Sequence, residues 1–403
     1  MDSLKIAMYS HDSVGLGHVR RNLALAGALT EQLPGWTGRP VTGLLITGTP
    51  AAPAFPAPPD WDWLLLPGIG KGTGGYLPRS LKMPLREVIG LRSSLLDAAL
   101  RAFRPDLMIV DRHATGIHGE LEPALRRAKA AGTRLVLGLR EVLDAPPTAL
   151  AEWFALGGPP LVRELFDEIW VYGDPSIHDP VSAGEVPSVL GDLIRYSGYL
   201  AAGRPAGGAP VEQSGPYCMT TVGGGSDGFE LAALSAAMVL PPGVAHLVVA
   251  GPQMPEDQVA VLRSLAREGT VVVPRLDDVV GHLRHAQAVV SMGGYNSVCE
   301  IMSTSVPALI VPRTQPRAEQ VIRARGLAQA GYVDWQDLNT LTPGLLRQWL
   351  DGRLGISIDR SRLRLDGLRR VPQLAAVQLQ DFCLRSTGRQ AAGKVRSTDR
   401  AYV

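Results

Sequence analysis

Short apolar segments alternate with longer helical stretches along almost the whole chain, and this alternation limits the fold more than any other feature. The segments end in glycine or a polar residue, and stretches with helical spacing separate most of them. Strands that are buried on both faces and joined by helices form parallel sheets. We expect strands at residues 5–10, 41–47, 61–66, 107–111, 134–139, 168–172, 217–222, 246–250, 271–274, 288–291, 308–311 and 332–334.

A domain boundary is visible near the middle of this chain of 403 residues, a length that suits two or three domains. Residues 201–215 (AAGRPAGGAPVEQSG) have no apolar period and are rich in Gly, Ala and Pro, as flexible linkers are. We therefore predict an α/β fold with two doubly wound domains, at 1–200 and 216–362. Residues 363–384 should form a docked helix, and 385–403 a disordered tail.

The composition argues against several classes of partner. Forty basic residues stand against 38 acidic ones, and only 5% of the residues are aromatic, so we expect no nucleic acid as partner. The three cysteines, Cys218, Cys299 and Cys383, form no C-x-x-C pair, which fits a reducing compartment. The chain begins without a signal-peptide pattern and contains no apolar run near 18 residues. We expect a cytoplasmic protein without a membrane span.

Two loops that follow predicted strands carry candidate acid–base residues. In an open parallel sheet, the ligand crevice lies at the carboxyl ends of the strands. The loop at 10–21 (SHDSVGLGHVRR) places Gly17 and His18 at the start of a helix. A histidine there suits a base that works near neutral pH, although His18 alone could equally cap or pack. Asp111 ends the fourth strand and can orient the His18 imidazole and raise its basicity.

Two other patterns lie near these loops. Asp111, His113 and His118 do not have a recognised metal-ligand spacing, so we expect no metal. The segment 68–76 (GIGKGTGGY) is too glycine-rich for us to expect one fixed shape. We interpret it as a mobile substrate lid, with phosphate binding as the alternative, and no motif explains the loop at 68–82 as a whole.

The second half opens with a glycine-rich loop that suits phosphate. The strand at 217–222 is followed at once by 223–228 (GGGSDG), and backbone amides in such a turn are donors for phosphate. The hexamer also matches G-x-G-x-x-G, which raises the possibility of a nicotinamide enzyme. That class needs an acidic residue at the end of the next strand, to hold the ribose. Gly251-Pro252-Gln253 stands there instead, which disfavours the nicotinamide hypothesis.

The most informative segment lies further on, where a strand, a glycine pair and a helix start make a second phosphate site at 291–300 (SMGGYNSVCE). Glu300 lies about one and a half turns into that helix, where a carboxylate can accept both hydroxyls of a ribose. Glu319 and Gln320 follow the next strand, and both are residue types that bind sugar hydroxyls. Each is unremarkable alone, but the spaced set favours a nucleotide-sugar site.

These motifs resemble the C-terminal domain of family 28 glycosyltransferases, and GLGH at 15–18 is similar to the glycine–histidine loop of their N-terminal domain. The resemblance is strongest for 293–320, moderate for 223–228 and weak for 36–215. It implies the GT-B architecture, in which two Rossmann-like domains face a central cleft and a C-terminal helix packs back on the first domain. It also implies an acceptor site in the first domain, a donor site mainly in the second, and an inverting, metal-independent reaction.

The resemblance also assigns roles to single residues. Glu300 is expected to bind the ribose, Glu319 and Gln320 the donor hexose, and the backbone of Leu276 the uracil edge. The residues expected to bind the diphosphate, mainly through backbone amides, are Gly224, Gly225, Ser226, Gly294, Tyr295, Asn296 and Ser297, and Gly17 is also expected to contact the donor.

We therefore predict a glycosyltransferase that moves a hexose-type sugar from a nucleoside diphosphate, most often UDP, to a hydroxyl or amine of a small acceptor, such as a natural product or a cell-envelope precursor. His18 is expected to deprotonate the acceptor with the help of Asp111, and no cofactor is expected beyond the nucleotide-sugar co-substrate. Two alternatives are a nucleotide-sugar 2-epimerase of the same architecture and a nucleotide-sugar-binding protein without turnover. The GLGH loop favours the transferase over the epimerase, and the presence of both a base and a full donor set argues against a binding protein.

Overall fold

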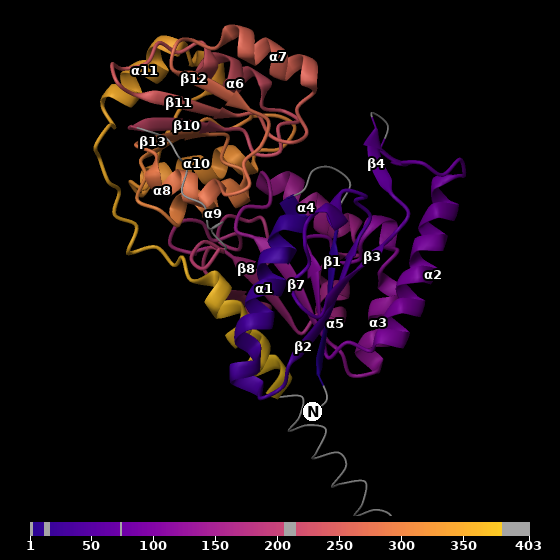
Figure 1. Ribbon diagram of the computed structural model, residues 1–403. Coiled ribbons are helices and arrows are strands. Elements are labelled where there is room, and N and C mark those ends of the chain that lie inside the picture. Colours follow the sequence, from indigo (N-terminus) through magenta and orange to yellow (C-terminus); the bar gives the residue numbers. More distant parts are fainter. Residues whose placement is uncertain (1–2, 12–16, 73–74, 205–214, 381–403) are drawn as a thin grey trace, which may run out of the picture.

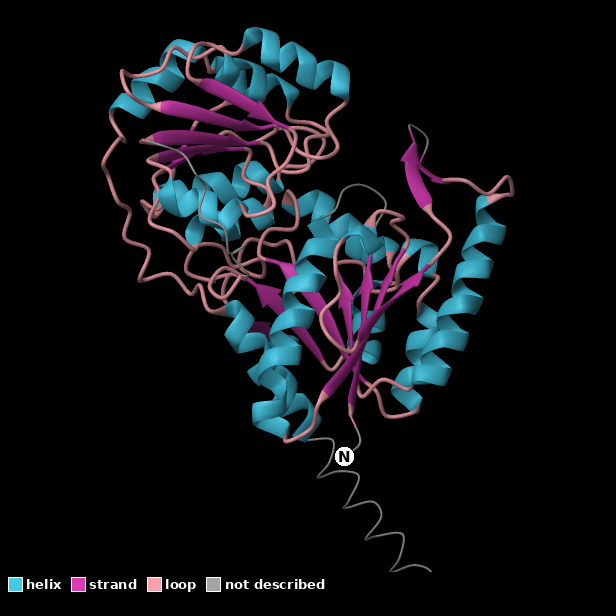
Figure 2. Ribbon diagram, in the orientation of Figure 1, coloured by secondary structure: helices cyan, strands magenta, loops and turns pink. Residues whose placement is uncertain are grey.

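Two parallel sheets organise the chain, one in each half of the sequence, and helices cover both faces of each sheet (Figures 1 and 2). The computed structural model describes residues 3–11, 17–72, 75–204 and 215–380. Each of the twelve expected strands is present, with bounds that differ from the expected ones by at most two residues. The predicted α/β fold with two doubly wound domains is confirmed.

The first sheet has the strand order β3-β2-β1-β6-β7-β8-β9. Its strands are β1 (Leu4–Ser10), β2 (Val41–Thr47), β3 (Trp61–Leu65), β6 (Leu107–Asp111), β7 (Arg134–Arg140), β8 (Glu168–Tyr172) and β9 (Ile194–Tyr196). The helices of this half are α1 (Gly17–Thr37), α2 (Leu85–Phe103), α3 (Glu122–Ala130), α4 (Pro146–Ala155) and α5 (Gly158–Leu165). Strand β9 was not predicted from the sequence, because three residues are too few to show a period.

The second sheet has the strand order β12-β11-β10-β13-β14-β15. Its strands are β10 (Tyr217–Thr221), β11 (Ala245–Val249), β12 (Thr270–Val273), β13 (Ala288–Ser291), β14 (Ala308–Ile310) and β15 (Asp334–Trp335). The helices are α6 (Phe229–Ala236), α7 (Glu256–Leu265), α8 (Val279–His285), α9 (Tyr295–Met302), α10 (Glu319–Gln329) and α11 (Pro343–Asp351).

Burial on both faces explains why the strands appear as continuous apolar runs. In β1, Ile6 and Met8 belong to the apolar cluster that includes Leu25 of α1, whereas Ala7 and Tyr9 belong to the cluster on the opposite face. A strand between two helical layers has no solvent side, so polar residues do not alternate along it. None of the helices in the described residues is both long enough and apolar enough to cross a membrane.

The glycine-rich segment after β3 forms a hairpin in its described part, a defined shape that was not expected from the sequence. Strands β4 (Ile69–Gly72) and β5 (Gly75–Pro78) pair antiparallel. Ile69 is fully buried in a small apolar cluster with Val88 of α2 and Ile117. This apolar anchor and the cross-strand pairing offset the backbone freedom that the glycines introduce. Residues 73–74 lie outside the described residues.

The chain returns from the second sheet to the first half near its C-terminal end. Residues 367–380 are helical, and Figure 1 shows this yellow helix beside α1. The Gly367 N–H donates to the Tyr199 carbonyl at 3.0 Å, and the Tyr199 N–H donates to the Arg364 carbonyl at 2.7 Å. Of the segments expected from the sequence, positions 205–214 of the linker, 381–384 of the helix and the whole tail at 385–403 lie outside the described residues.

Candidate active site

Both sheets reverse their strand order at a point that the sequence analysis had marked as a site. The reversal lies between β1 and β6 in the first sheet and between β10 and β13 in the second. Residue Ser10 pairs with Asp111, and Thr221 pairs with Ser291, so these strands end level with each other. Ligands of doubly wound sheets bind where the order reverses, outside the carboxyl ends of the strands. The loops after these four strands therefore form the candidate active site.

The histidine and aspartate at the first reversal point lie in direct contact. His18 Nδ1 is 2.7 Å from Asp111 Oδ2, as the sequence analysis expected. Arg21, which was not predicted from the sequence, donates from Nη2 to Asp111 Oδ1 at 2.7 Å and to Oδ2 at 2.6 Å. The side chains of Arg21 and Asp111 are 2% and 1% exposed, whereas His18 keeps 19%. The signal was the spacing, because a residue three positions after His18 lies on the same face of α1.

The charges around Asp111 determine the protonation states of this group. Burial would raise the pKa of Asp111, but Arg21 and His18 together hold it well below its ordinary value. Burial lowers the pKa of His18 below 6.5, and Asp111 offsets only part of that effect. At neutral pH the group thus holds a neutral imidazole beside a carboxylate. Nδ1 also lies 2.9 Å from Arg21 Nη2, which can only donate, so Nδ1 has an acceptor on one side and a donor on the other. In the tautomer whose Nδ1–H donates to the carboxylate, Nε2 is the nitrogen that can take a proton.

A group of aromatic rings lies next to His18, and we call His11, Tyr76, His113 and His118 the histidine cluster. His11 Nε2 is 3.0 Å from the Tyr76 hydroxyl, which the β4–β5 hairpin supplies. The rings of His11 and His113 lie in contact at a tilt of 36°, with centroids 3.6 Å apart, and the His11 and His18 centroids are 6.4 Å apart. Burial lowers the pKa of His11 to about 3 and that of His113 well below 6.5. These two rings are therefore uncharged at neutral pH.

The described residues contain no group of three or more His, Cys, Asp or Glu side chains arranged to hold a metal ion. The histidine cluster and Asp111 therefore do not form such a group. An Asp-x-Asp sequence, the pattern of many metal-dependent sugar transferases, does occur at 60–62. It lies at the amino end of β3, the edge strand of the first sheet, whereas the candidate site lies at the carboxyl ends of β1 and β6.

The glycine-rich loop after β10 has the geometry of an anion-binding turn. Gly225 has a φ of +92°, and a Cβ there would lie 2.4 Å from the Ala250 carbonyl oxygen. Only glycine fits, because both the backbone conformation and the space exclude a side chain. Among the described residues, no acceptor is found for the N–H groups of Gly224, Gly225 or Ser226, and Gly224 and Ser226 are exposed. Three backbone donors are thus available at the second reversal point.

The start of α9 connects this loop to the first half of the chain. A Cβ on Gly223 would lie 3.9 Å from Ser297 Oγ, which places the glycine-rich loop beside the first turn of α9. Asn296 Nδ2 donates to the Gly17 carbonyl at 2.9 Å, so the N-terminal ends of α9 and α1 meet. Gly294 precedes α9, and its carbonyl accepts from the Val298 N–H at 2.9 Å. The predicted diphosphate residues therefore lie together, next to the helix that carries His18.

The side chain of Tyr295 has a structural role that the sequence analysis did not foresee. It is 3% exposed, its hydroxyl donates to the Tyr172 carbonyl at 2.9 Å, and it accepts from the Leu200 N–H at 3.3 Å. The phenol ring thus joins α9 to β8 and to the end of the first half. Only the backbone N–H of Tyr295, in the first turn of α9, can face a ligand.

Glu300 is not an open carboxylate in this structure. Its Oε1 accepts from Arg20 Nη2 at 2.5 Å and lies 3.3 Å from Arg204 Nη1. The Glu300 side chain is 5% exposed. The expected role of Glu300 was to bind a ribose. Neither arginine was predicted, because both come from the first half or the linker and lie far away in the sequence.

The residues expected to bind the hexose are held by Arg313. Its Nη2 donates to Glu319 Oε1 at 3.0 Å, and its backbone N–H donates to Gln320 Oε1 at 3.2 Å. Burial would raise the pKa of Glu319, but Arg140 and Arg313 lower it below its ordinary value. Glu319 Oε2 is buried and has no partner among the described residues. This ionised oxygen remains able to accept a hydrogen bond, as a sugar hydroxyl would require.

Leu276, which was expected to bind the donor, and two further ion pairs complete the set of residues considered. Leu276 is partly buried between β12 and α8 and packs against the large apolar cluster. Arg323 of α10 donates to Glu141 Oε1 at 2.5 Å, and both side chains are almost fully buried. Arg317 Nη2 donates to Glu152 Oε1 at 2.6 Å. These pairs, which were not predicted from the sequence, join the loop and helix after β14 to the loop after β7 and to α4.

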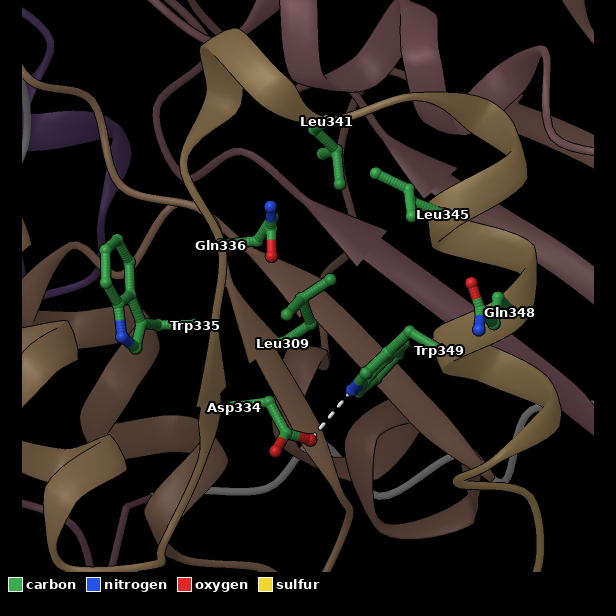
Figure 3. A pocket seen from close by; sticks show the side chains of 8 residues that line it. All are labelled: Leu309, Asp334, Trp335, Gln336, Leu341, Leu345, Gln348 and Trp349. Carbon is green, nitrogen blue, oxygen red and sulfur yellow. Dashed lines mark hydrogen bonds between the residues drawn. The ribbon is translucent and has the colours of Figure 1, made fainter.

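A separate pocket lies away from these residues. Figure 3 shows its lining side chains between β15 and α11, and Trp349 Nε1 donates to Asp334 Oδ2 at 2.7 Å. None of the expected site residues lines it. The lining residues are Leu309, Asp334, Trp335, Gln336, Leu341, Leu345, Gln348 and Trp349.

Comparison with known proteins agrees with this geometry. Residues 219–352 match the glycosyltransferase family 28 C-terminal domain. The match contains the glycine-rich loop, α9 and the start of α10. The chain is a glycosyltransferase.

Similarity to individual proteins of known sequence is low where it spans most of this chain, and higher only over a short segment. The glycosyltransferase is 22% identical to an uncharacterised glycosyltransferase of Methanosarcina acetivorans over 281 residues, which are 66% of this chain and 69% of that protein. It is 32% identical to the UDP-N-acetylglucosamine–N-acetylmuramyl-(pentapeptide) pyrophosphoryl-undecaprenol N-acetylglucosamine transferase of Shouchella clausii. That match spans 74 residues, 18% of this chain and 21% of the other.

A solved structure shows the same architecture over nearly the whole chain. The glycosyltransferase superposes on a calicheamicin glycosyltransferase with a TM-score of 0.59 at 17% identity, and the alignment covers 96% of this chain and 99% of that one. The likeness supports the expected GT-B arrangement of two Rossmann-like domains.

Proposed function

We propose that this glycosyltransferase transfers a hexose-type sugar from a nucleoside diphosphate to a hydroxyl or amine of a small acceptor, with inversion and without a metal ion. The observation that carries the proposal is the convergence of two half-sites. A partly exposed histidine paired with a buried aspartate lies at one reversal point, an amide-rich loop and helix start lie at the other, and the contact between Asn296 and Gly17 joins them.

His18 is the proposed base. Its Nε2 would take the proton of the acceptor as the acceptor oxygen or nitrogen attacks the anomeric carbon, opposite the leaving group. Arg21 would hold the Asp111 carboxylate in place, and Asp111 would accept from Nδ1–H in the required tautomer and stabilise the imidazolium that forms. Because the pKa of His18 is lowered, the base is ready at neutral pH.

The donor would lie across the site on the second half of the chain. The amides of Gly224, Gly225 and Ser226, together with those of the first turn of α9, would stabilise the departing diphosphate. Such fixed dipoles can bear the charge that a metal ion bears in other transferases, which is the basis for proposing metal independence. Glu319 Oε2 supports hexose binding, because it is buried, ionised and without a partner among the described residues.

Uridine is the proposed nucleoside, and Leu276 would present its backbone to the uracil edge. The support is the sequence similarity to the Shouchella clausii enzyme, whose name specifies a UDP-linked sugar. The acceptor would lie against the histidine cluster in the first half of the chain. Since His11 and His113 are uncharged at neutral pH, these two rings suit an uncharged face of the acceptor.

A donor screen tests the proposed function. The intact protein is incubated with UDP-glucose, UDP-galactose, UDP-N-acetylglucosamine and dTDP-glucose, and the release of nucleoside diphosphate is followed. We expect slow hydrolysis of one donor without acceptor, and faster release with a working acceptor. Conversion of UDP-N-acetylglucosamine alone to its manno isomer would instead establish the epimerase. Tight binding of a donor without any release would establish a binding protein.

A further inference from the structure

An arginine beside the proposed base forms an ion pair with the other half of the chain. Arg20 lies in the first turn of α1, two residues after His18, and its Nη2 is 2.5 Å from Glu300 Oε1 on α9. The Arg20 side chain is 37% exposed, whereas the Glu300 side chain is 5% exposed. The pair is therefore buried on its acidic side and open to solvent on its basic side.

Arg204 forms a second, more deeply held contact with the same carboxylate. Its Nε donates to the Leu200 carbonyl at 2.6 Å, its Nη2 donates to Asn296 Oδ1 at 3.1 Å, and its Nη1 lies 3.3 Å from Glu300 Oε1. The Arg204 side chain is 7% exposed. Three contacts on three separate groups fix this guanidinium, while Glu300 is the one contact recorded for the side chain of Arg20 among the described residues.

A ribose bound at Glu300 would compete with one of these arginines. A ribose diol donates two hydrogen bonds, and both oxygens of a carboxylate are the usual acceptors for such a pair. Arg204 would have to give up two further partners in order to leave, but Arg20 would not. Arg20 is thus the residue that the nucleoside would displace from Glu300.

The displaced guanidinium would lie close to the proposed diphosphate site. Arg20 is three residues after Gly17, whose carbonyl contacts Asn296 in the first turn of α9. The neighbouring Ser297 lies beside Gly223 of the glycine-rich loop. A long, flexible side chain in the first turn of α1 can therefore turn from the α9 carboxylate toward an anion held between α9 and that loop. Arginine suits this task, because its planar donors bind phosphate oxygens bidentately.

We propose that Arg20 exchanges partners when the donor binds, leaving Glu300 to the ribose and binding the diphosphate itself. This inference rests on the proposed function, since it takes Glu300 as the ribose ligand. It adds a mobile positive charge to the fixed amides around the leaving group.

Calorimetric titration of Arg20→Gln with a nucleoside, its monophosphate and its diphosphate tests the exchange. The probes are uridine, UMP and UDP, or the matching series for whichever of UDP, dTDP, ADP and GDP the parent binds best. The variant should bind the diphosphate roughly 10- to 100-fold more weakly, the usual scale for charged hydrogen bonds. Nucleoside affinity should stay the same or increase, because Glu300 loses a competitor. Arg20→Lys should restore part of the diphosphate affinity.

Arg126→Gln is the matched control, since Arg126 is a comparably exposed helical arginine that pairs with Glu122 at 3.0 Å, far along the chain from the site. It should change none of the three affinities. Glu300→Gln should show the complementary pattern, a weaker nucleoside with an unchanged gain from the added phosphates.

Two results would overturn the inference in distinguishable ways. If Arg20→Gln tightens the diphosphate and the nucleoside equally, or leaves their ratio unchanged, Arg20 is only a latch on Glu300 and does not bind phosphate. If the parent protein binds none of the nucleotides, the proposed function itself fails, and the exchange fails with it.

Discussion

Replacing Asp111 with asparagine should lower the free energy of unfolding of the protein, apart from any effect on the reaction. The carboxylate receives three contacts from Arg21, at 2.6, 2.7 and 3.2 Å, and the two side chains are 1% and 2% exposed. Removal of one partner from a buried ion pair costs about 3–5 kcal/mol, because the other charge stays buried without compensation. Asparagine keeps one acceptor oxygen for Arg21, so we expect about 3 kcal/mol, near the lower limit.

Thermal unfolding of matched variants measures this loss. For a domain of roughly 150–250 residues, 1 kcal/mol shifts Tm by about 2–4 °C, so Asp111→Asn should lower Tm by roughly 6–12 °C. Asp192→Asn makes the same chemical change in an exposed pair with Arg163 and should leave Tm nearly unchanged, because solvent screens that pair. In an Arg21→Met background, Asp111→Asn should cost much less than it does alone.

The comparison between the two asparagine variants tests whether the buried ion pair stabilises the fold. If Asp111→Asn lowers Tm no more than Asp192→Asn does, the buried pair does not stabilise the fold as argued. A full cost in the Arg21→Met background would show that Asp111 acts through another partner. Turnover of Asp111→Asn has to be measured well below its Tm, where loss of activity reports on His18 and not on unfolding.

Three further predictions concern the reaction. His18→Ala should reduce turnover by about 10²- to 10⁴-fold and leave the affinity for nucleoside diphosphate unchanged, and a loss of that affinity would show that His18 is a donor ligand. Because burial lowers the pKa of His18, turnover should be constant from neutral pH upward and should fall on acidification with a midpoint below 6.5, so a midpoint above 6.5 would contradict the assigned base. Turnover should survive excess EDTA, whereas a loss that Mg²⁺ or Mn²⁺ restores would assign the leaving-group charge to a cation.

The positions of the strands and of the loops that follow them could be predicted from the sequence alone. Buried parallel strands are local apolar runs, so each is visible without knowledge of its neighbours. In a doubly wound sheet, the site lies just after particular strands, and this rule placed His18, Asp111, the glycine-rich loop and the start of α9 correctly relative to the sheets. The family resemblance added the expected GT-B arrangement.

Contacts that depend on packing between distant segments could not be predicted in this way. The β4–β5 hairpin is anchored because Ile69 packs against Val88 of α2. The glycine-rich sequence of the hairpin does not reveal this contact. Arg21 on Asp111, and Arg20 and Arg204 on Glu300, join residues 90, 280 and 96 positions apart. An arginine looks the same in sequence whether it is solvated or holds a buried carboxylate. The sequence thus determined which residues stand at the ends of the strands, and only the tertiary structure, by bringing the two halves together, decided which charges those residues meet.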